Sequence, residues 1–274
     1  MRETMSGLRV RLDRISLTLA LNTLAIVALV LLLAPAVIVI VVSFTSSYSL
    51  RFPPPGYSLR WYTALIDAWQ LQFAAMNSFK VALWTTLLAV VLGVGAALGI
   101  GRSRMTSALL LDALFMSPLM LPGIAFGLSA LMFFSALQMP LSELTLVIGH
   151  TVVCVPFVVR VTSAALVQLD PALLESSASL GASRLYGFRH VTLPLILPGV
   201  LAGGFLAFMT SFDNVIVSLF LRSAGTDMLP IRMWQDVEGQ LDVRIAAVSG
   251  LLIGATLILL VIMERLAGFS QRLR

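Results

Sequence analysis

The sequence predicts an all-α, polytopic membrane helical bundle with six transmembrane helices, and three observations predict it. Apolar residues make up 59% of the 274 residues and charged residues only 11%, whereas an ordinary soluble domain carries about 25% charged residues. Long uncharged stretches recur along the chain, near the length of about 20 residues with which a helix crosses a bilayer. The basic residues stand in short clusters between these stretches, as they do in cytoplasmic membrane loops.

The predicted spans, in chain order, cover residues 15–44, 81–100, 112–143, 144–159, 194–221 and 245–263. The first is too long for the core of a signal peptide, and no convincing cleavage site follows it, so we expect a retained helix. Small residues four positions apart within the spans allow close helix packing. These pairs are Gly95 and Gly99, Gly123 and Gly127, and Gly199 and Gly203. We expect residues 1–274 to form a single transmembrane domain.

The distribution of basic residues predicts the orientation. We assign the N-terminus, the loops around residues 101–112 and 160–193, and the C-terminus to the cytoplasm. These segments hold 12 of the 18 basic residues, so the positive-inside rule places both termini in the cytoplasm. The twelve are Arg2, Arg9, Arg11, Arg14, Arg102, Arg104, Arg160, Arg184, Arg189, Arg265, Arg272 and Arg274.

Several classes of function have little support in the composition. Cys154 is the single cysteine, so an intrachain disulfide and a cysteine-based metal site are both excluded. The two histidines, His150 and His190, are far apart in the sequence, and we expect no metal. The net charge of +5 does not indicate nucleic acid, because the basic residues form no single patch. We expect His150 to be a hydrogen-bonded packing residue.

Two long segments are predicted on the external side. Residues 45–76 contain a proline-rich stretch from Phe52 to Gly56 and the aromatic pair Trp61 and Tyr62. Prolines stiffen an extended chain, and such rings suit the headgroup level of a bilayer. Residues 222–244 carry charges of both signs. Each segment is either a solvated or interfacial loop or a docking surface for an external partner.

The cytoplasmic loop from Gln168 to Leu193 predicts two short helices joined by an elbow. Asp170 can cap a helix whose first position is Pro171. Gly181 interrupts the helical spacing where the backbone turn needs either a positive φ or a close approach, and Ser183 can cap a second helix. Helices this short are not stable alone in water. They need either a protein or the lipid surface to pack against.

This loop resembles the signature of binding-protein-dependent ABC permeases. The signature has an acidic residue, two small residues and, six positions after the acid, a glycine; an aliphatic residue, a spacer and Leu-Pro follow. Here it reads Glu175-Ser176-Ser177, Gly181, Val191 and Leu193-Pro194, with a further Pro198. The family usually has Ala at the two Ser positions and often Ile where Val191 stands. These departures keep size and shape.

Further segments are similar to the C-type permease subunits of spermidine/putrescine importers. They are Phe52 to Trp61, Pro118 to Gly127, Ser211-Phe212-Asp213-Asn214 and Leu229-Pro230-Ile231. The resemblance implies the type I ABC importer permease fold in a bacterial inner membrane, surrounded by lipid. It implies a second, related permease, a cytoplasmic ABC ATPase dimer and a periplasmic or external solute-binding protein. It also implies a coupling role for the loop residues Glu175, Ser176, Ser177, Gly181, Ala182 and Ser183.

The chain has no G-x-x-x-x-G-K-[ST] phosphate loop. We therefore expect a transport subunit and not an enzyme, with no cofactor of its own and with ATP and Mg on the partner ATPase. The most favoured solute is a polyamine, because the resemblance is to that branch. Another small solute of related permeases, such as an organophosphonate, iron or a sugar, stays open. So does the choice between a different partner permease, which we favour, and a second copy.

Polar residues and helix breakers inside the spans predict the solute path. Asp213 lies within the predicted fifth span beside Ser211, Phe212 and Asn214. A carboxylate there suits a cationic solute, or it forms an internal ion pair or a protonated, hydrogen-bonded group. Pro118, Pro122 and Gly123 can free backbone groups in the third span, which makes them candidates for a gate.

Rival interpretations remain at this level. A secondary transporter or channel predicts internal repeats and more charge inside the membrane, and we see no clear repeat. A membrane scaffold is compatible with the composition. A membrane enzyme needs a cluster of catalytic groups near one face, and Asp213 and His150 alone do not make one. None of the three explains the signature in the cytoplasmic loop.

Overall fold

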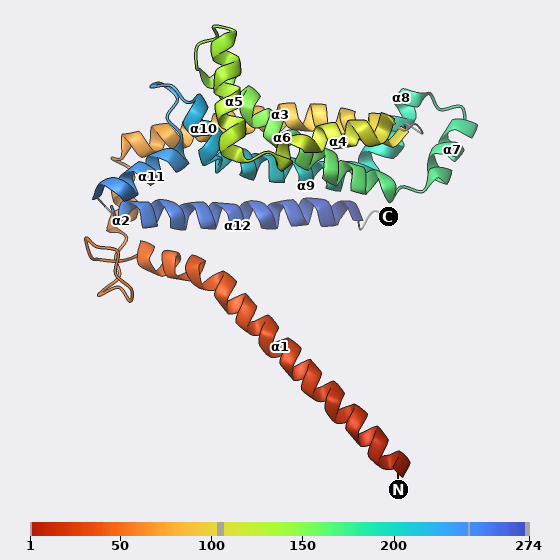
Figure 1. The fold of residues 1–274 in the computed structure, drawn as a ribbon, viewed down its shortest axis with the longest axis horizontal. Helices are drawn as coiled ribbons and strands as arrows, with labels where there is room; N and C mark the ends of the chain where they lie inside the picture. The colour runs from red at the N-terminus through yellow and green to blue at the C-terminus, as the bar shows by residue number, and fades with distance from the viewer. Residues whose placement is uncertain (1, 103–106, 241, 272–274) are drawn as a thin grey trace. The chain divides into compact units, whose positions relative to one another are not determined.

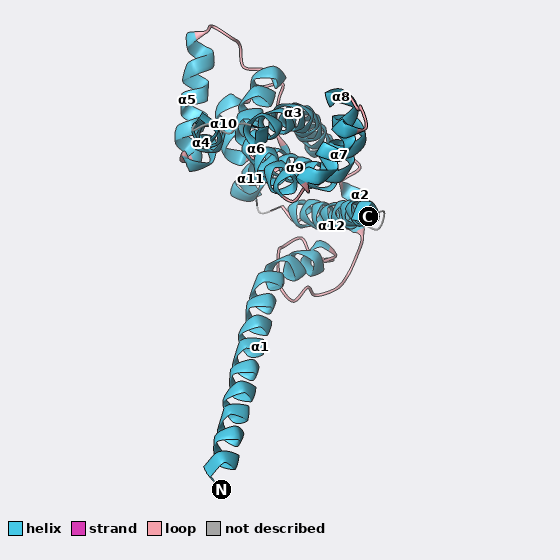
Figure 2. Cartoon of the chain, turned by 90° about the vertical axis from the view of Figure 1, so that its right-hand side faces the viewer, coloured by secondary structure: helices cyan, strands magenta, loops and turns pink. Residues whose placement is uncertain are grey.

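The computed structural model describes residues 2–102, 107–240 and 242–271. Arg104, Arg272 and Arg274, which contribute to the predicted orientation, lie outside the described residues. The chain divides into two compact units, which are described one at a time. Within the described residues every regular element is helical, and Figures 1 and 2 show the helices in two views.

The first unit comprises residues 1–67 and 241–255. It holds α1 (Arg2–Ser43), the short α2 (Arg60–Ala64) and the start of α12 (Arg244–Gln271). The described part of α1 that is long and apolar enough to cross a membrane is Leu17–Ser43. This confirms the first predicted span.

The loop between α1 and α2 is ordered by its own contacts. Thr45 and Tyr57 form an isolated antiparallel bridge, and the backbone N–H of Ser46 donates to the carbonyl of Gly56 at 2.9 Å. The guanidinium of Arg60 lies 4.1 Å from the ring centre of Tyr48 and 4.9 Å from that of Trp61. Stacking of this kind holds a cation without burying it.

The second unit comprises residues 68–240 and 256–274. Three long helices, α3 (Trp69–Arg102), α6 (Glu143–Val167) and α9 (Leu193–Phe212), pack against one another as its core and run side by side in Figure 1. Of the helices with spanning length, α6 has the largest buried share. It is therefore the central helix of this unit.

Glycine allows the core helices to approach closely. A Cβ on Gly203 would lie 3.1 Å from the Cα of Val158, and one on Gly199 would lie 2.6 Å from the Cβ of Ala165. This confirms the packing role predicted for that pair of glycines. Gly95 and Gly99 differ, because a Cβ at either position would meet no atom within 4 Å.

The third span is broken. It consists of α4 (Ser107–Met120) and α5 (Gly123–Ala136), and the two helices are bent by 101°. Pro122 stands at the break in an extended conformation, with φ −55° and ψ 127°. Proline has no N–H to continue the helix and disfavours helical geometry in the residue before it, which accounts for the end of α4 near Leu121.

Short helices complete the second unit. They are α7 (Pro171–Ser179), α8 (Arg184–Gly187), the π-helical turn η1 (Phe188–Thr192), α10 (Val215–Leu221) and α11 (Leu229–Gln240). Five described helices have the length and hydropathy of a membrane span, and the bent pair α4–α5 makes a sixth. The predicted number of spans is thus compatible with the structure.

Several predicted boundaries were wrong. The second span begins at Trp69 and not at 81, and the fourth reaches Val167 and not 159. Polar residues such as Asn77 and Thr162 lower the local hydropathy without ending a helix that packs against neighbours. The segments predicted to be external are correspondingly more ordered, because residues 69–76 belong to α3 and residues 229–240 form α11.

Candidate functional site

The first part of the candidate site is the start of α7. Asp170 takes the extended conformation of a helix cap, and its side chain accepts a hydrogen bond from the backbone N–H of Ala172 at 2.9 Å. Pro171 follows at the first helical position, where its missing N–H costs nothing. Both predictions for this helix start are confirmed.

The end of α7 forms the predicted elbow. Gly181 has φ +84°, a conformation that glycine adopts at little cost. Its N–H donates to the carbonyl of Ala178 at 3.0 Å, and the N–H of Ala182 donates to that of Ser177 at 3.1 Å. These two bonds are the Schellman motif, which satisfies the last carbonyls of a helix. The elbow is thus fixed by local backbone hydrogen bonds.

A second capped turn returns the chain to the bundle. The hydroxyl of Ser183 accepts from the N–H of Tyr186 at 3.3 Å, as predicted. The helix then widens, because the N–H of Leu193 donates to the carbonyl of Phe188, five residues earlier. Pro194 follows and has no N–H to donate. The short helix α8 (Arg184–Gly187) thus continues without a gap through η1 into α9.

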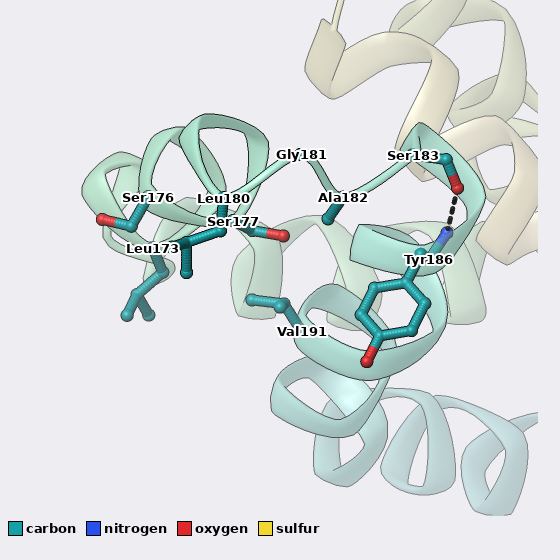
Figure 3. A pocket seen from close by; sticks show the side chains of 9 residues that line it. All are labelled: Leu173, Ser176, Ser177, Leu180, Gly181, Ala182, Ser183, Tyr186 and Val191. Carbon is teal, nitrogen blue, oxygen red and sulfur yellow. Dashed lines mark hydrogen bonds between the residues drawn. The ribbon is translucent and has the colours of Figure 1, made fainter.

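These elements surround a surface hollow of about 820 Å³ (Figure 3). Its lining includes Ser176, Ser177, Gly181, Ala182 and Ser183 from the predicted coupling residues, together with Leu173, Leu180, Tyr186 and Val191. The structure thus brings these five predicted residues to one concave surface. Sequence reasoning missed the part of Leu180 and Tyr186 in it.

The elements around the hollow expose apolar groups and one acid. Leu180 is 89% exposed and Leu185 is 76% exposed. Glu175 is exposed on α7 and forms no ion pair with any side chain in the described ranges. A surface that combines bare leucines with a free carboxylate is suited to a protein partner.

The second part of the candidate site is a break in the fifth span. The predicted continuous helix over residues 194–221 was wrong, because α9 ends at Phe212 and α10 begins at Val215. Asp213 follows the end of α9 and is exposed. The side chain of Asn214 caps α10 by accepting from the N–H of Val217 at 2.9 Å. Competition of Asn with the backbone at a helix start explains the break.

The neighbours of Asp213 have different environments. The ring of Phe212 stacks on Phe208 with centroids 5.9 Å apart, and Phe208 meets Phe79 of α3 edge to face at 5.8 Å. Ser211 is fully buried, and its hydroxyl lies 2.9 Å from Nδ1 of His150. Of the four predicted path residues, only Asp213 is therefore prominently exposed.

The predicted gate residues lie at the break of the third span. Pro118 is inside α4, Pro122 precedes α5, and Gly123 begins α5. A Cβ on Gly123 would lie 3.0 Å from Cδ1 of Ile216 in α10. One turn further, a Cβ on Gly127 would lie 2.5 Å from the ring of Phe220. The segments that follow the two breaks, α5 and α10, therefore pack directly on each other.

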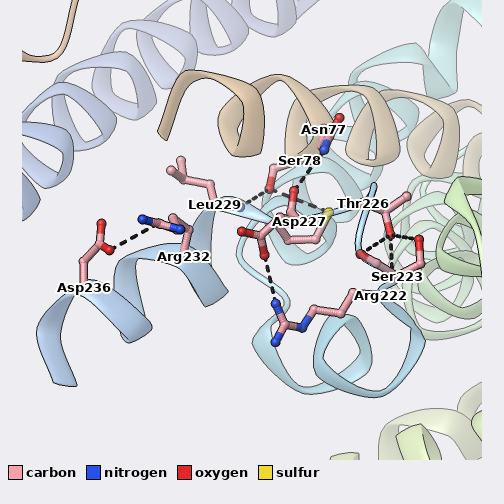
Figure 4. A network of polar contacts seen from close by, with 10 residues as sticks. Asn77, Ser78, Arg222, Ser223, Thr226, Asp227, Leu229, Arg232 and Asp236 are labelled. Carbon is pink, nitrogen blue, oxygen red and sulfur yellow. Dashed lines mark hydrogen bonds and ion pairs between the residues drawn. The ribbon is translucent and has the colours of Figure 1, made fainter. Parts of the chain in front are cut away.

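The segment 222–229, which the sequence predicts to be external, is tied to α3 by polar contacts (Figure 4). Arg222 forms an ion pair with Asp227 at 3.0 Å, and the amide of Asn77 donates to the carbonyl of Asp227 at 3.1 Å. The buried hydroxyl of Ser78 accepts from the N–H of Leu229 at 2.8 Å. This segment, predicted as either a solvated loop or a partner surface, is an ordered surface.

Among the described residues, no group of three or more His, Cys, Asp or Glu could hold a metal ion. Cys154 is buried, and its Sγ lies 3.4 Å from the carbonyl of Ala207. The expectation for His150 is confirmed, because both of its ring nitrogens have hydroxyl partners.

Residues 89–272 match the family described as binding-protein-dependent transport system inner membrane component. The putrescine transport system permease protein PotI of Escherichia coli (strain K12) is 31% identical over 233 residues, which are 82% of each chain. The spermidine/putrescine transport system permease protein PotC of the same strain is 29% identical over 234 residues, 85% of this chain and 88% of that protein.

A solved structure supports the fold. A chain of a bacterial alginate ABC transporter, in complex with its alginate pentasaccharide-bound periplasmic protein, superposes with a TM-score of 0.72 and 17% identity. The match covers 95% of this chain and 96% of that one. The helical architecture is therefore that of type I ABC importer permeases.

Permeases of this kind are non-catalytic subunits that bind no cofactor themselves and work with an ATPase and a solute-binding protein. The family match spans most of the bundle and includes the capped elbow and both broken spans. The chain therefore belongs to the binding-protein-dependent transport system inner membrane components, as a multi-pass permease subunit of an ABC importer.

Proposed function

We propose that this permease serves a polyamine importer, that it pairs with a different but related permease, and that both of its termini are cytoplasmic. The names of the relatives at 29–31% identity support the solute class. The observation that carries the proposal is Asp213, an exposed carboxylate at the end of the spanning helix α9 and two residues before α10. Ionisable groups at such places face a water-filled path or the interior of the assembly.

The proposed path uses the surroundings of Asp213. Its carboxylate and the amide of Asn214 offer hydrogen-bond acceptors to an ammonium group. The stacked rings of Phe212 and Phe208 give the aliphatic part of a polyamine an apolar wall. Ser211 supports this region from its buried side. The break at Pro118, Pro122 and Gly123 is the proposed gate, because α5 contacts α10 next to Asp213.

The proposed link to ATP hydrolysis is the capped elbow. Glu175, Ser176, Ser177, Gly181, Ala182 and Ser183 would contact the ATPase, and the bare Leu180 and Leu185 would be covered by it. The hollow of Figure 3 has room for a side chain of the partner. The transport cycle requires the permease to shift almost completely from one conformation to another. For that shift, ATP binding must change the relative free energy of the two conformations by about 5.5 kcal/mol through this contact.

The test begins with the chain purified from detergent-solubilised membranes together with its partners. We expect an ATPase, a second permease and a solute-binding protein to co-purify. A homodimeric permease would contradict the proposed pairing. Reconstituted into vesicles with ATP inside, the assembly is expected to take up labelled spermidine or putrescine when the loaded binding protein is outside.

The solute assignment is tested by removing one charge. Asp213→Asn keeps the shape of the side chain, and we expect it to raise KM for the polyamine by roughly tenfold, as the loss of a hydrogen bond to a charged group does. Glu264→Gln removes an exposed charge near the end of α12 and is the matched control. Uptake of an organophosphonate, iron or a sugar in place of polyamine would overturn the solute and leave the permease role intact.

A further inference from the structure

A buried polar cluster lies next to the break in the fifth span. His150 of α6 is fully buried. Its Nδ1 lies 2.9 Å from the hydroxyl oxygen of Ser211, and its Nε2 lies 3.1 Å from that of Ser218. Both serines are fully buried as well. The imidazole is thus hydrogen-bonded through both ring nitrogens within the protein interior.

The two serines stand on opposite sides of the break. Ser211 lies in α9, two residues before Asp213, and Ser218 lies in α10. A neutral imidazole has one N–H donor and one nitrogen acceptor. One serine hydroxyl therefore accepts from the ring and the other donates to it. The two bonds therefore have opposite donor and acceptor roles at the ring, and they join α9 to α10 through a third helix.

Helix α10 packs closely on α6 beside the cluster. A Cβ on Gly149, the neighbour of His150, would lie 2.5 Å from Cδ1 of Leu221 and 3.2 Å from Cγ1 of Val217. The α10 segment therefore lies directly on the backbone of α6. Because α10 has only seven residues, its position depends on such contacts and not on its own helical stability.

We propose that His150 is a positioning residue of the transport cycle: through Ser211 and Ser218 it holds α9 and α10 at one relative orientation and so sets the place of Asp213. The importance of Asp213 itself rests on the proposed function. Loss of either hydrogen bond leaves a buried polar group unsatisfied and frees the two helices to change their orientation.

The experiment uses the whole importer in vesicles and a reporter thiol on α10. Leu219→Cys places the thiol at an exposed position, and the chain's own Cys154 is buried and stays silent. Into this background we introduce Ser218→Ala, Ser211→Ala or His150→Asn. The serine variants remove one atom each and are expected to fold.

We expect each variant to increase the rate of maleimide labelling at position 219 and to abolish its difference between nucleotide-free and ATP-bound states. We also expect KM for the solute to rise roughly tenfold, as when a buried partner loses its hydrogen bond. Combining His150→Asn with either serine variant is expected to add less than the sum of the two effects, because the three residues act as one unit.

The matched control is Thr151→Val. Thr151 is buried beside His150, but its hydroxyl donates to the carbonyl of Val147 within its own helix at 2.6 Å. We expect this variant to label like the parent. Parent-like labelling of the serine variants, or equal changes in Thr151→Val, would overturn the positioning role. The labelling is measured without solute, so its test of the positioning role does not depend on the polyamine assignment.

Discussion

The elbow after α7 and the break after α9 both interrupt helices, but they are held in different ways. At the elbow, Asp170, Gly181 and Ser183 satisfy the backbone within a few residues, and the surface above them is exposed. At the break, a buried histidine reaches hydroxyls that are 61 and 68 residues away in the chain. The first interruption is built by local sequence, whereas the second combines the local cap of Asn214 with tertiary contacts.

This difference suits the two positions. A surface that binds and releases a partner benefits from a shape that is fixed by local contacts. Because such a surface is already ordered before binding, it loses less conformational entropy when the partner binds. The polar groups buried beside the break, such as Ser211 and Ser218, are shielded from water and therefore need partners from other helices. The comparison predicts that substitutions at the elbow alter coupling, whereas substitutions at the break alter both stability and transport.

The largest effect is expected from Gly181→Val. A β-branched residue is strained at φ +84°, so the elbow would lose its shape while the bundle stays folded. We expect uptake to fall by about 100-fold, near the upper end of typical coupling between sites, with an unchanged melting temperature. Uptake and thermal unfolding are measured in parallel.

Gly101→Val is the control for the elbow. Gly101 lies near the end of α3, and a Cβ there would have only Leu166 as a neighbour, at 4.0 Å. We expect normal uptake. If Gly181→Val lowers the melting temperature as well as uptake, the elbow contributes to the stability of the fold. That result would contradict the proposed difference between the elbow and the break.

A smaller effect, on stability, is expected at the break. Gly149→Ala adds a Cβ 2.5 Å from Leu221, and overpacking of this kind costs about 1–3 kcal/mol. Gly95→Ala adds the same group where no atom lies within 4 Å, and it is expected to gain about 0.5–1 kcal/mol from helix propensity. Denaturation of the two variants in detergent measures the change in the free energy of unfolding, which is expected to have opposite signs. Equal changes in the two variants would mean that α10 is not held against α6.

The smallest effect is expected from Ser183→Ala. It removes the cap of α8 and should cost about 1 kcal/mol locally. We expect faster amide exchange at Tyr186, whose N–H loses its acceptor, and unchanged exchange in α6. Ser163→Ala is the control, because the Ser163 hydroxyl has no hydrogen-bond partner among the described residues. Faster exchange in α6 would show that the elbow is coupled to the core.

Much of the elbow could be predicted from the sequence, because its determinants are neighbours in the chain. The cap at Asp170, the positive φ at Gly181 and the cap at Ser183 each depend on residues within three or four positions. The number of spans was also accessible, since hydropathy averages over long windows. Pro122 lay among the expected helix breakers, although the angle of the bend did not follow from it.

The break at Asp213 was missed for a physical reason. The run from Pro194 to Leu221 is apolar throughout apart from a few polar residues, so its hydropathy is that of one helix. Asn214 was a signal for a helix start, and its side chain does cap α10 through the N–H of Val217. The partners of His150, Ser211 and Ser218, could not be paired from the sequence alone, because each lies on a different helix.

Gly123 faces Ile216 and Gly127 faces Phe220, so α5 and α10 run parallel as one packed pair, with two joints beside each other at the same end. One joint is the bend at Leu121–Pro122, and the other is the interruption at Asp213–Asn214. In such a pair, a rotation of α5 at its joint is expected to displace the start of α10. The bend of the third span and the position of the Asp213 carboxylate are therefore expected to change together.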